Sequence, residues 1–220
     1  MPSAPTAQLL ISKTCVFVAC FTLLGVLGAC ASKSPTDPGV SITRTGVIGD
    51  YSTLQPSPRH PDTLYEQSAR LTEYTAFVID DIRFLPTTTL RGVPIDPDTA
   101  NRLAAELRAE VVAALTPRYK VVDRGGPGVA RIRAAVTQVS RGRTTTDAID
   151  VGGASVEAEI VDSVSGERLG AAVESDTLDP MHARPREDPF YDARMVFRHW
   201  AARLRLWLDD AHRGVLPPTR

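Results

Sequence analysis

The residue with the most clearly indicated chemistry is Cys30, which directly follows Leu27-Gly28-Ala29. Residues 14–32 carry no charge and contain the apolar core of a signal peptide. Small residues before the Cys suit a peptidase cleavage site, and the thiol can then form a thioether with diacylglycerol. We therefore predict a signal peptide over residues 1–29 and lipidation, with fatty acyl chains such as palmitate, at Cys30. The alternative is a retained transmembrane helix, because the run is close to the ~20 residues that a membrane span needs.

The pattern Leu27-Gly28-Ala29-Cys30 resembles the bacterial lipobox. Two or more acyl chains give stable attachment to the lipid bilayer, at roughly 0.8 kcal/mol per buried methylene group. In Gram-negative lipoproteins, Asp after the lipidated Cys is associated with retention in the inner membrane, whereas this chain has Ala31. The resemblance therefore implies an outer-membrane lipoprotein that faces the periplasm.

Two pairs of carboxylates have spacings that acid–base catalysis sometimes uses. Asp80 and Asp81 are adjacent in a predicted strand, so their side chains point to opposite faces. Glu157 and Glu159 share a strand face, but Arg133 on the neighbouring predicted strand is expected to pair with Glu159. We interpret both pairs as structural and predict no catalytic residue.

One polar loop contains the remaining candidates for ligand binding, at residues 141–147. Arg141, Arg143, Thr144 and Thr145 could hold an anion through guanidinium and hydroxyl donors. The favoured alternative is a solvated connection between strands, because loops are polar in general.

Motifs of enzymes and cofactor sites are otherwise absent from the sequence. It contains no Gly-x-Ser-x-Gly, His-Glu-x-x-His, Cys-x-x-Cys or Gly-Lys-Ser/Thr motif. Cys15 and Cys20 leave with the signal, and no His lies within a helical turn of another His or Cys, so we predict no metal or cofactor. A formal net charge of −1 gives no support for a nucleic-acid partner.

The composition divides the rest of the chain into a tether and a domain. Hydrophobic residues at 43% and charged residues at 23% are typical of a soluble globular protein. Residues 30–70 comprise the lipidated Cys and a tether rich in Ser, Thr, Pro and Gly, with an apolar docking arm at residues 46–56. Residues 71–214 are predicted to form a single α+β domain, and residues 215–220 a tail.

The domain is predicted to begin with a strand at residues 75–84, which is rich in β-branched and aromatic side chains. Asp96-Pro97 then provides an N-cap and a first-turn proline for an amphipathic helix that ends at Thr116-Pro117. A short strand at residues 119–123 leads into the turn Gly125-Gly126-Pro127-Gly128.

Alternating apolar residues predict the register of the next two strands, which run antiparallel. The expected pairs are Ile132 with Ile160, Ala134 with Ala158, Val136 with Val156 and Arg133 with Glu159. A two-residue hairpin at Ser165-Gly166 then places Ala171 and Val173 beside Ile160 and Ala158 on a strand that ends near Glu174.

A second amphipathic helix is predicted from Asp188-Pro189 to the terminators Gly214 and Pro217. Its apolar stripe, which we expect to lie in the core, consists of Ala193, Val196, Phe197, Trp200, Leu204, Trp207 and Leu208. The predicted fold is therefore α+β: a single mixed, mainly antiparallel sheet of about five strands with two amphipathic helices on one face.

Three segments of the chain resemble an uncharacterised bacterial lipoprotein family, domain of unknown function 3313. They are residues 46–54, residues 152–163 together with residues 165–169, and Trp200-Ala201-Ala202-Arg203-Leu204. The resemblance implies a single-domain, periplasm-facing lipoprotein with no assigned activity and no catalytic residue to carry over. It also implies that residues 50–52 belong to a docked arm.

Two hypotheses about function follow from these features. The first is a non-enzymatic interaction or envelope-assembly accessory module with an envelope protein as its partner. The alternative is a hydrolase of envelope glycans or lipids, or a protein that binds a small ligand, using Asp80, Glu157 or the loop from Arg141 to Thr146. A cleft that unites these residues would favour the alternative.

Overall fold

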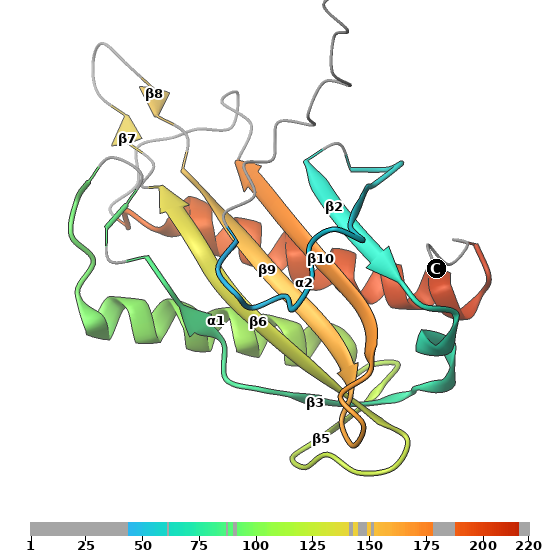
Figure 1. The fold of residues 1–220 in the computed structure, drawn as a ribbon. Coiled ribbons are helices and arrows are strands. Elements are labelled where there is room, and N and C mark those ends of the chain that lie inside the picture. Colours follow the sequence, from blue (N-terminus) through green and yellow to red (C-terminus); the bar gives the residue numbers. More distant parts are fainter. Residues whose placement is uncertain are drawn as a thin grey trace, which may run out of the picture. The chain divides into compact units, whose positions relative to one another are not determined.

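The computed structural model describes residues 44–60, 62–86, 88–89, 92–140, 143–144, 149–150, 152–177 and 188–215. Most of this part of the chain forms an eight-stranded mixed sheet and two long helices (Figure 1). The sheet has the strand order β1-β2-β10-β9-β6-β3-β5, and β4 also pairs with β6. In chain order the elements are β1 (Gln55–Pro56), β2 (Thr63–Gln67), the 3-10 helix η1 (Ala69–Glu73), β3 (Ala76–Ile79), β4 (Arg83–Phe84), α1 (Pro97–Leu115), β5 (Lys120–Val122), β6 (Val129–Ser140), β7 (Arg143–Thr144), β8 (Ile149–Asp150), β9 (Gly153–Asp162), β10 (Arg168–Thr177) and α2 (Tyr191–His212).

The sheet has eight strands rather than about five, which corrects the sequence-based prediction. The strands β1 and β2 come from residues 30–70, whose composition indicates a tether, and β2 pairs antiparallel with β10. The predicted strand at residues 75–84 is divided into β3 and β4 because its pairing with β6 shifts by one residue between Ile79 and Arg83.

The predicted register of β6 and β9 is confirmed. Ile132 pairs with Ile160, Ala134 with Ala158, Val136 with Val156 and Arg133 with Glu159. Because side chains alternate along a strand, the apolar members of these pairs occupy one face of the sheet and the charged pair the other.

The predicted register of β10 is wrong by one residue. Ala172, and not Val173, lies opposite Ala158, because the turn is longer than predicted and the pairing with β9 then shifts between Arg168 and Gly170. The connection is also longer than a two-residue hairpin: Gly166 adopts φ +74° and donates its N–H to Asp162 O at 3.0 Å. The shift exchanges the two faces of β10, since a slip of one residue moves every side chain to the other side.

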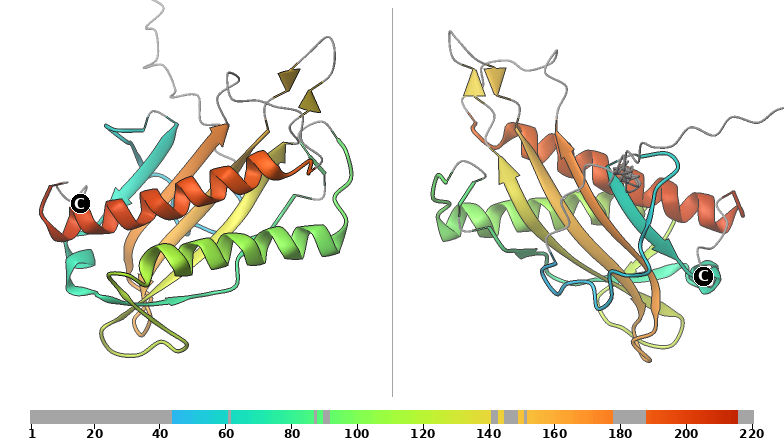
Figure 2. Two further views of the ribbon diagram at one scale, coloured as in Figure 1. Left: turned by 180° about the vertical axis from the view of Figure 1, so that it is seen from behind. Right: turned by 45° about the horizontal axis from the view of Figure 1, so that its top comes forward.

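The two helices lie on the same face of the sheet, as predicted (Figure 2, left). The N-terminus of α1 is capped by Asp96, whose side chain accepts a hydrogen bond from Thr99 N at 2.8 Å. No helix among the described residues is long and apolar enough to cross a membrane.

The start of α2 differs from the prediction. The N-cap residue is Phe190, without a side-chain cap, and Asp188 instead accepts the Phe190 N–H at 3.0 Å and forms an ion pair with Arg194. At the other end, Gly214 follows the helix with φ +65°, as expected for its predicted role as a terminator.

The main core lies between the helices and the sheet. It includes the predicted apolar stripe of α2, of which Trp200 is only 5% exposed, and Leu204 and Trp207 are partly buried. Other fully buried members are Phe77, Leu103, Leu115, Ile132, Ile160, Phe197 and Leu208.

The opposite face of the sheet is covered by the arm, which docks on its own domain. Figure 1 shows this segment, in blue, in front of the sheet, with the helices behind. Ile48 is 1% exposed and packs with Leu64, Ala171 and Val173 in a second apolar cluster. The change of register in β10 is what brings its two apolar residues to this face.

Candidate functional site

A cavity of about 230 Å³ lies between the sheet and the two helices. Its floor contains Ala134, Ala158 and Ala172, which are direct neighbours on β6, β9 and β10. Small side chains at the same level of three adjacent strands leave space that the helices do not fill. Although their strands lie inside the sheet, Ala158 and Ala172 remain partly exposed.

The wall opposite the sheet is formed by apolar side chains from both helices. Leu107 and Val111 come from α1, and Trp200, Leu204 and Trp207 from α2. The volume is larger than the ~150 Å³ of a cavity that holds benzene and smaller than the ~300–1,000 Å³ of pockets for drug-sized ligands. The space therefore suits a small apolar molecule or part of an alkyl chain.

Charged groups from β10 and α2 meet in the wall of the cavity. Glu174 forms an ion pair with Arg203, whose Nη2 also lies 2.9 Å from Asp176 Oδ2. Burial raises the pKa of Glu174 to about 7, although Arg203 opposes this shift, and the nearby Asp176 adds to it. This carboxyl group therefore changes charge near neutral pH.

The loop between β1 and β2 forms one end of the cavity. The hydroxyl oxygen of Ser57 accepts hydrogen bonds from the backbone N–H of Arg59 at 3.3 Å and of His60 at 3.2 Å. Arg59 forms an ion pair with Asp210 of α2 and so connects the loop to the helix. Burial and the positive charges of Arg203 and Arg59 lower the pKa of His60, against a smaller opposing effect of Asp176.

Three nitrogen donors on residues that line the cavity have no hydrogen-bond partner within the described chain. They are Nε1 of Trp200, Nε1 of Trp207 and Nε of Arg203. The three residues are spaced at i, i+3 and i+7, so they lie on one face of α2. An unsatisfied buried donor costs about 1–3 kcal/mol, and a water or a ligand with acceptor atoms would remove that cost.

The carboxylates considered from the sequence lie on the arm-covered face. Glu159 forms the predicted ion pair with Arg133 at 3.2 Å. Glu157 Oε2 accepts hydrogen bonds from Thr45 Oγ1 at 2.6 Å and from the Tyr51 hydroxyl at 2.5 Å. The arm therefore binds the sheet through Glu157, and neither glutamate lines the cavity.

The aspartates of the β3–β4 connection are also separate from the cavity. Asp80 Oδ1 lies 2.5 Å from Arg131 Nη1, and Asp81 has an exposed side chain 3.6 Å from Arg108 Nε. The hydrolase hypothesis requires Asp80 and Glu157 to meet in one cleft. Neither residue lines this cavity.

The remaining sequence candidates are only partly described. Arg143 and Thr144 form β7, which pairs with β8 in a separate two-stranded sheet (Figure 1). Arg141, Thr145 and Cys30 lie outside the described residues. Among the residues that are described, no cluster of three or more His, Cys, Asp or Glu side chains could hold a metal ion.

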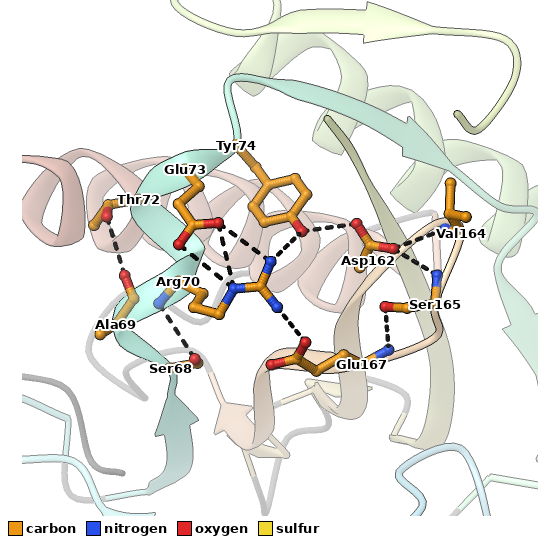
Figure 3. Close-up of polar contacts among 10 residues, drawn as sticks. All are labelled: Ser68, Ala69, Arg70, Thr72, Glu73, Tyr74, Asp162, Val164, Ser165 and Glu167. Carbon is orange, nitrogen blue, oxygen red and sulfur yellow. Dashed lines mark hydrogen bonds and ion pairs between the residues drawn. The ribbon is translucent and has the colours of Figure 1, made fainter. Parts of the chain in front are cut away.

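A polar network on the surface joins η1 to the β9–β10 turn (Figure 3). Arg70 forms ion pairs with Glu73 and Glu167, and the Tyr74 hydroxyl donates to Asp162 Oδ2 at 2.7 Å. Burial and this hydrogen bond raise the pKa of Tyr74 to about 12. The Arg and Glu side chains are about half exposed and satisfy one another, so we interpret the network as a structural contact.

Sequence reasoning missed the polar residues of the cavity. Arg59 and His60 lie in the segment whose composition indicates a tether, and the sequence predicts Glu174 only as the end of a strand. Glu174 pairs with Val156 and therefore lies on the helix-covered face of the sheet. Only the correct register of β10, one residue from the predicted one, would have placed it there. Arg203 lies between the two Trp residues on the predicted apolar stripe, where a cation is unexpected.

The fold is a two-layer α+β arrangement in which two helices cover one face of a mixed sheet and enclose a cavity. The chain belongs to a family described as "Protein of unknown function (DUF3313)", whose model matches residues 43–204. This confirms the resemblance drawn from the sequence.

Solved structures similar to this chain share low sequence identity with it. The PelC dodecamer from Paraburkholderia phytofirmans is 14% identical, with 64% of this chain and 96% of that chain covered and a TM-score of 0.41. A "putative lipoprotein" from Caulobacter crescentus CB15 is 16% identical, with coverages of 67% and 95% and a TM-score of 0.37. The protein XCC0632 from Xanthomonas campestris is 10% identical, with coverages of 74% and 94% and a TM-score of 0.39. No curated protein matches the chain.

Proposed function

We propose that this protein is an outer-membrane lipoprotein, anchored through acylated Cys30 and facing the periplasm, whose domain binds a small amphiphile without a chemical step. The observation that carries this proposal is the cavity between helices and sheet, where an apolar space borders a set of charged and hydrogen-bonding groups. Ligand pockets commonly combine an apolar lining with a few polar groups that orient the ligand.

The apolar lining supplies the main contribution to binding. Each buried methylene contributes about 0.8 kcal/mol, so six to eight of them would contribute roughly 5–6 kcal/mol. That is less than the ~8 kcal/mol of a micromolar complex. A polar head group that is recognised at the charged end of the cavity would supply the difference.

The proposed anchor would keep this cavity close to a source of amphiphiles. Residues between Cys30 and Arg44 can span at most about 50 Å, at ~3.3–3.6 Å per residue. The start of the domain would thus stay within about 50 Å of the bilayer surface. An envelope protein that delivers or receives the ligand is the partner we propose, and crosslinking of intact envelopes followed by isolation of the lipoprotein tests for it.

The chain's own fluorescence provides a direct binding assay. Its two Trp residues both line the cavity, so a brominated ligand that enters it should quench most of the emission. A chain that begins at Thr36 lacks Cys30 but includes every residue that the structure describes, so it allows the assay without the anchor. We expect saturable quenching by ω-bromodecanoate or ω-bromodecanol; no saturable quenching by either would overturn the ligand-binding proposal.

A matched pair of substitutions separates entry into the cavity from binding elsewhere. Ala158→Leu adds a large side chain to the floor, and should abolish quenching while leaving the fold intact or more stable, because it fills an existing space. Ala202→Leu makes the same change at an exposed position of α2 and should leave binding unchanged. Equal affinity in the two variants would place the ligand outside the cavity.

The anchoring part of the proposal has its own test. Cys30→Ser should block lipidation, leave the signal uncleaved and remove the protein from the outer-membrane fraction. Mass spectrometry of the unmutated protein should show an acylated Cys30 at the mature N-terminus. A retained signal without acyl mass would instead support the transmembrane alternative.

A further inference from the structure

The unsatisfied polar atoms of the residues that line the cavity indicate which kind of head group this end of the cavity favours. All three are donors: Nε of Arg203 and the indole nitrogens of Trp200 and Trp207. An Arg guanidinium and an indole N–H have no acceptor capacity, so only acceptor atoms of a ligand or of water can satisfy them. A head group that is itself a donor, such as an ammonium, leaves these three groups unpaired.

Arg203 has free binding capacity although it forms two ion pairs. The contacts to Glu174 and Asp176 both use Nη2, and a guanidinium has five N–H donors in all. The two Trp residues lie one helical turn before and one turn after Arg203, and all three line the cavity. The side chain of Arg203 is 24% exposed although its Nε is buried, so a ligand reaches other atoms of the side chain.

We propose, on the basis of the ligand-binding function above, that Arg203 binds the carboxylate of a fatty-acid-like ligand through the guanidinium N–H groups that its two ion pairs leave free. The alkyl chain lies against the alanine floor formed by Ala134, Ala158 and Ala172. Carboxylate and guanidinium have matching planar geometry, and hydrogen bonds between charged groups are about twice as strong as neutral ones.

The charge of the neighbouring groups makes this binding depend on pH. The charged groups that act on Glu174 are Arg203 and Asp176, and Arg59, His60 and Asp210 line the same cavity. Because Glu174 has a pKa of about 7, it is neutral in more molecules at pH 6 than at pH 8. A neutral Glu174 no longer competes with a ligand carboxylate for Arg203, so affinity rises as the pH falls.

The test compares head groups on one chain length, using the quenching assay. We expect ω-bromodecanoate to bind roughly ten- to a hundredfold more tightly than ω-bromodecanol at pH 6, the range for a hydrogen bond to a charged group. Arg203→Gln should remove this preference but keep the affinity for the alcohol. Arg203→Lys should retain part of it, since the charge remains. Arg205→Gln, on the same helix but outside the cavity lining, should change nothing.

The outcomes separate this inference from the proposed function. Equal binding of the acid and the alcohol would overturn the carboxylate site and leave the amphiphile pocket standing. Tighter binding of ω-bromodecylamine would show that Glu174 and Asp176 select a cation, which also overturns it. Absence of binding by all three compounds would refute the proposed function itself. Circular dichroism of each variant shows whether the fold is retained, and Arg203→Lys carries the test if Arg203→Gln does not fold.

Discussion

The two faces of the central sheet are covered in different ways, and the difference determines where a ligand can bind. On one face the arm packs Ile48 against apolar side chains of β2 and β10, and its Tyr51 hydroxyl donates to Glu157, so that a segment of the chain fills the space. On the other face two helices lie across a floor of alanines and leave a cavity. An arm adapts to the surface beneath it, whereas two long rigid helices meet a sheet only at their largest side chains.

A single strand, β9, contributes side chains to both faces of the sheet, because successive side chains of a strand point to opposite faces. On β9, Glu157 and Glu159 face the arm, and Ala158 and Ile160 face the helices. Charged residues on one face and small or apolar residues on the other therefore come from a single stretch of sequence. This shows that the pair of carboxylates most suggestive of catalysis in the sequence belongs to the filled side of the molecule.

The largest expected effect tests the helix-covered face. Trp200→Ala should lower the free energy of unfolding by about 3–5 kcal/mol, because it truncates a large buried side chain that packs against Phe197 with ring centroids 5.8 Å apart. Val164→Ala, at a side chain that is 67% exposed, should change it by less than ~0.5 kcal/mol. Denaturant unfolding measures both, and equal stabilities of the two variants would mean that Trp200 is not part of the core.

A paired substitution then separates stability from binding on the two faces. Ile48→Ala and Leu107→Ala each truncate a buried aliphatic side chain, one under the arm and one at the cavity, and each should cost about 2–4 kcal/mol. Only Leu107→Ala should also alter the quenching by ω-bromodecanoate at a temperature where both are folded. If Ile48→Ala alters it equally, the two faces are coupled and the arm contributes to the ligand site.

Much of the helix-covered face could be predicted from local sequence. The Asp96-Pro97 start of α1, the apolar stripe of α2 and the pairing of Ala134 with Ala158 depend on neighbours in sequence or on alternation, and all three are confirmed. Such features are specified by periodicity and capping, which a single sequence shows directly.

The cavity could not be predicted, because it depends on one residue of register and on a distant loop. The length of the β9–β10 turn and a bulge between Arg168 and Gly170 together decide that Ala172, and not Val173, lies beside Ala158, and a Val there would narrow the floor. Nothing in the local pattern marks that bulge. The ion pair of Arg59 with Asp210 joins residues that are far apart in sequence, so composition alone indicates only a polar tether.

The smallest expected effect concerns Glu174, the buried carboxyl group of the cavity. Its pKa is raised from 4.5 to about 7, so between these pH values the folded protein binds more protons than the unfolded chain does. Stability should therefore fall as the pH rises from about 5 to 8, by an amount on the order of 1–3 kcal/mol. Glu174→Gln removes the titrating group and should flatten this part of the profile, measured as unfolding free energy against pH.

Two other groups serve as controls because their shifts have the opposite sign. His60 has a lowered pKa, so its contribution to stability is lost as the pH falls and cannot produce a decline toward alkaline pH. Asp162 also has a lowered pKa, chiefly through the backbone N–H of Ser165 and the Tyr74 hydroxyl, so Asp162→Asn should change only the acidic limb of the profile. A decline from pH 5 to 8 that persists in Glu174→Gln would show that another group titrates there. If that decline is as large as in the unmutated protein, Glu174 does not titrate between pH 5 and 8, and the pH dependence inferred for ligand binding at Arg203 is overturned.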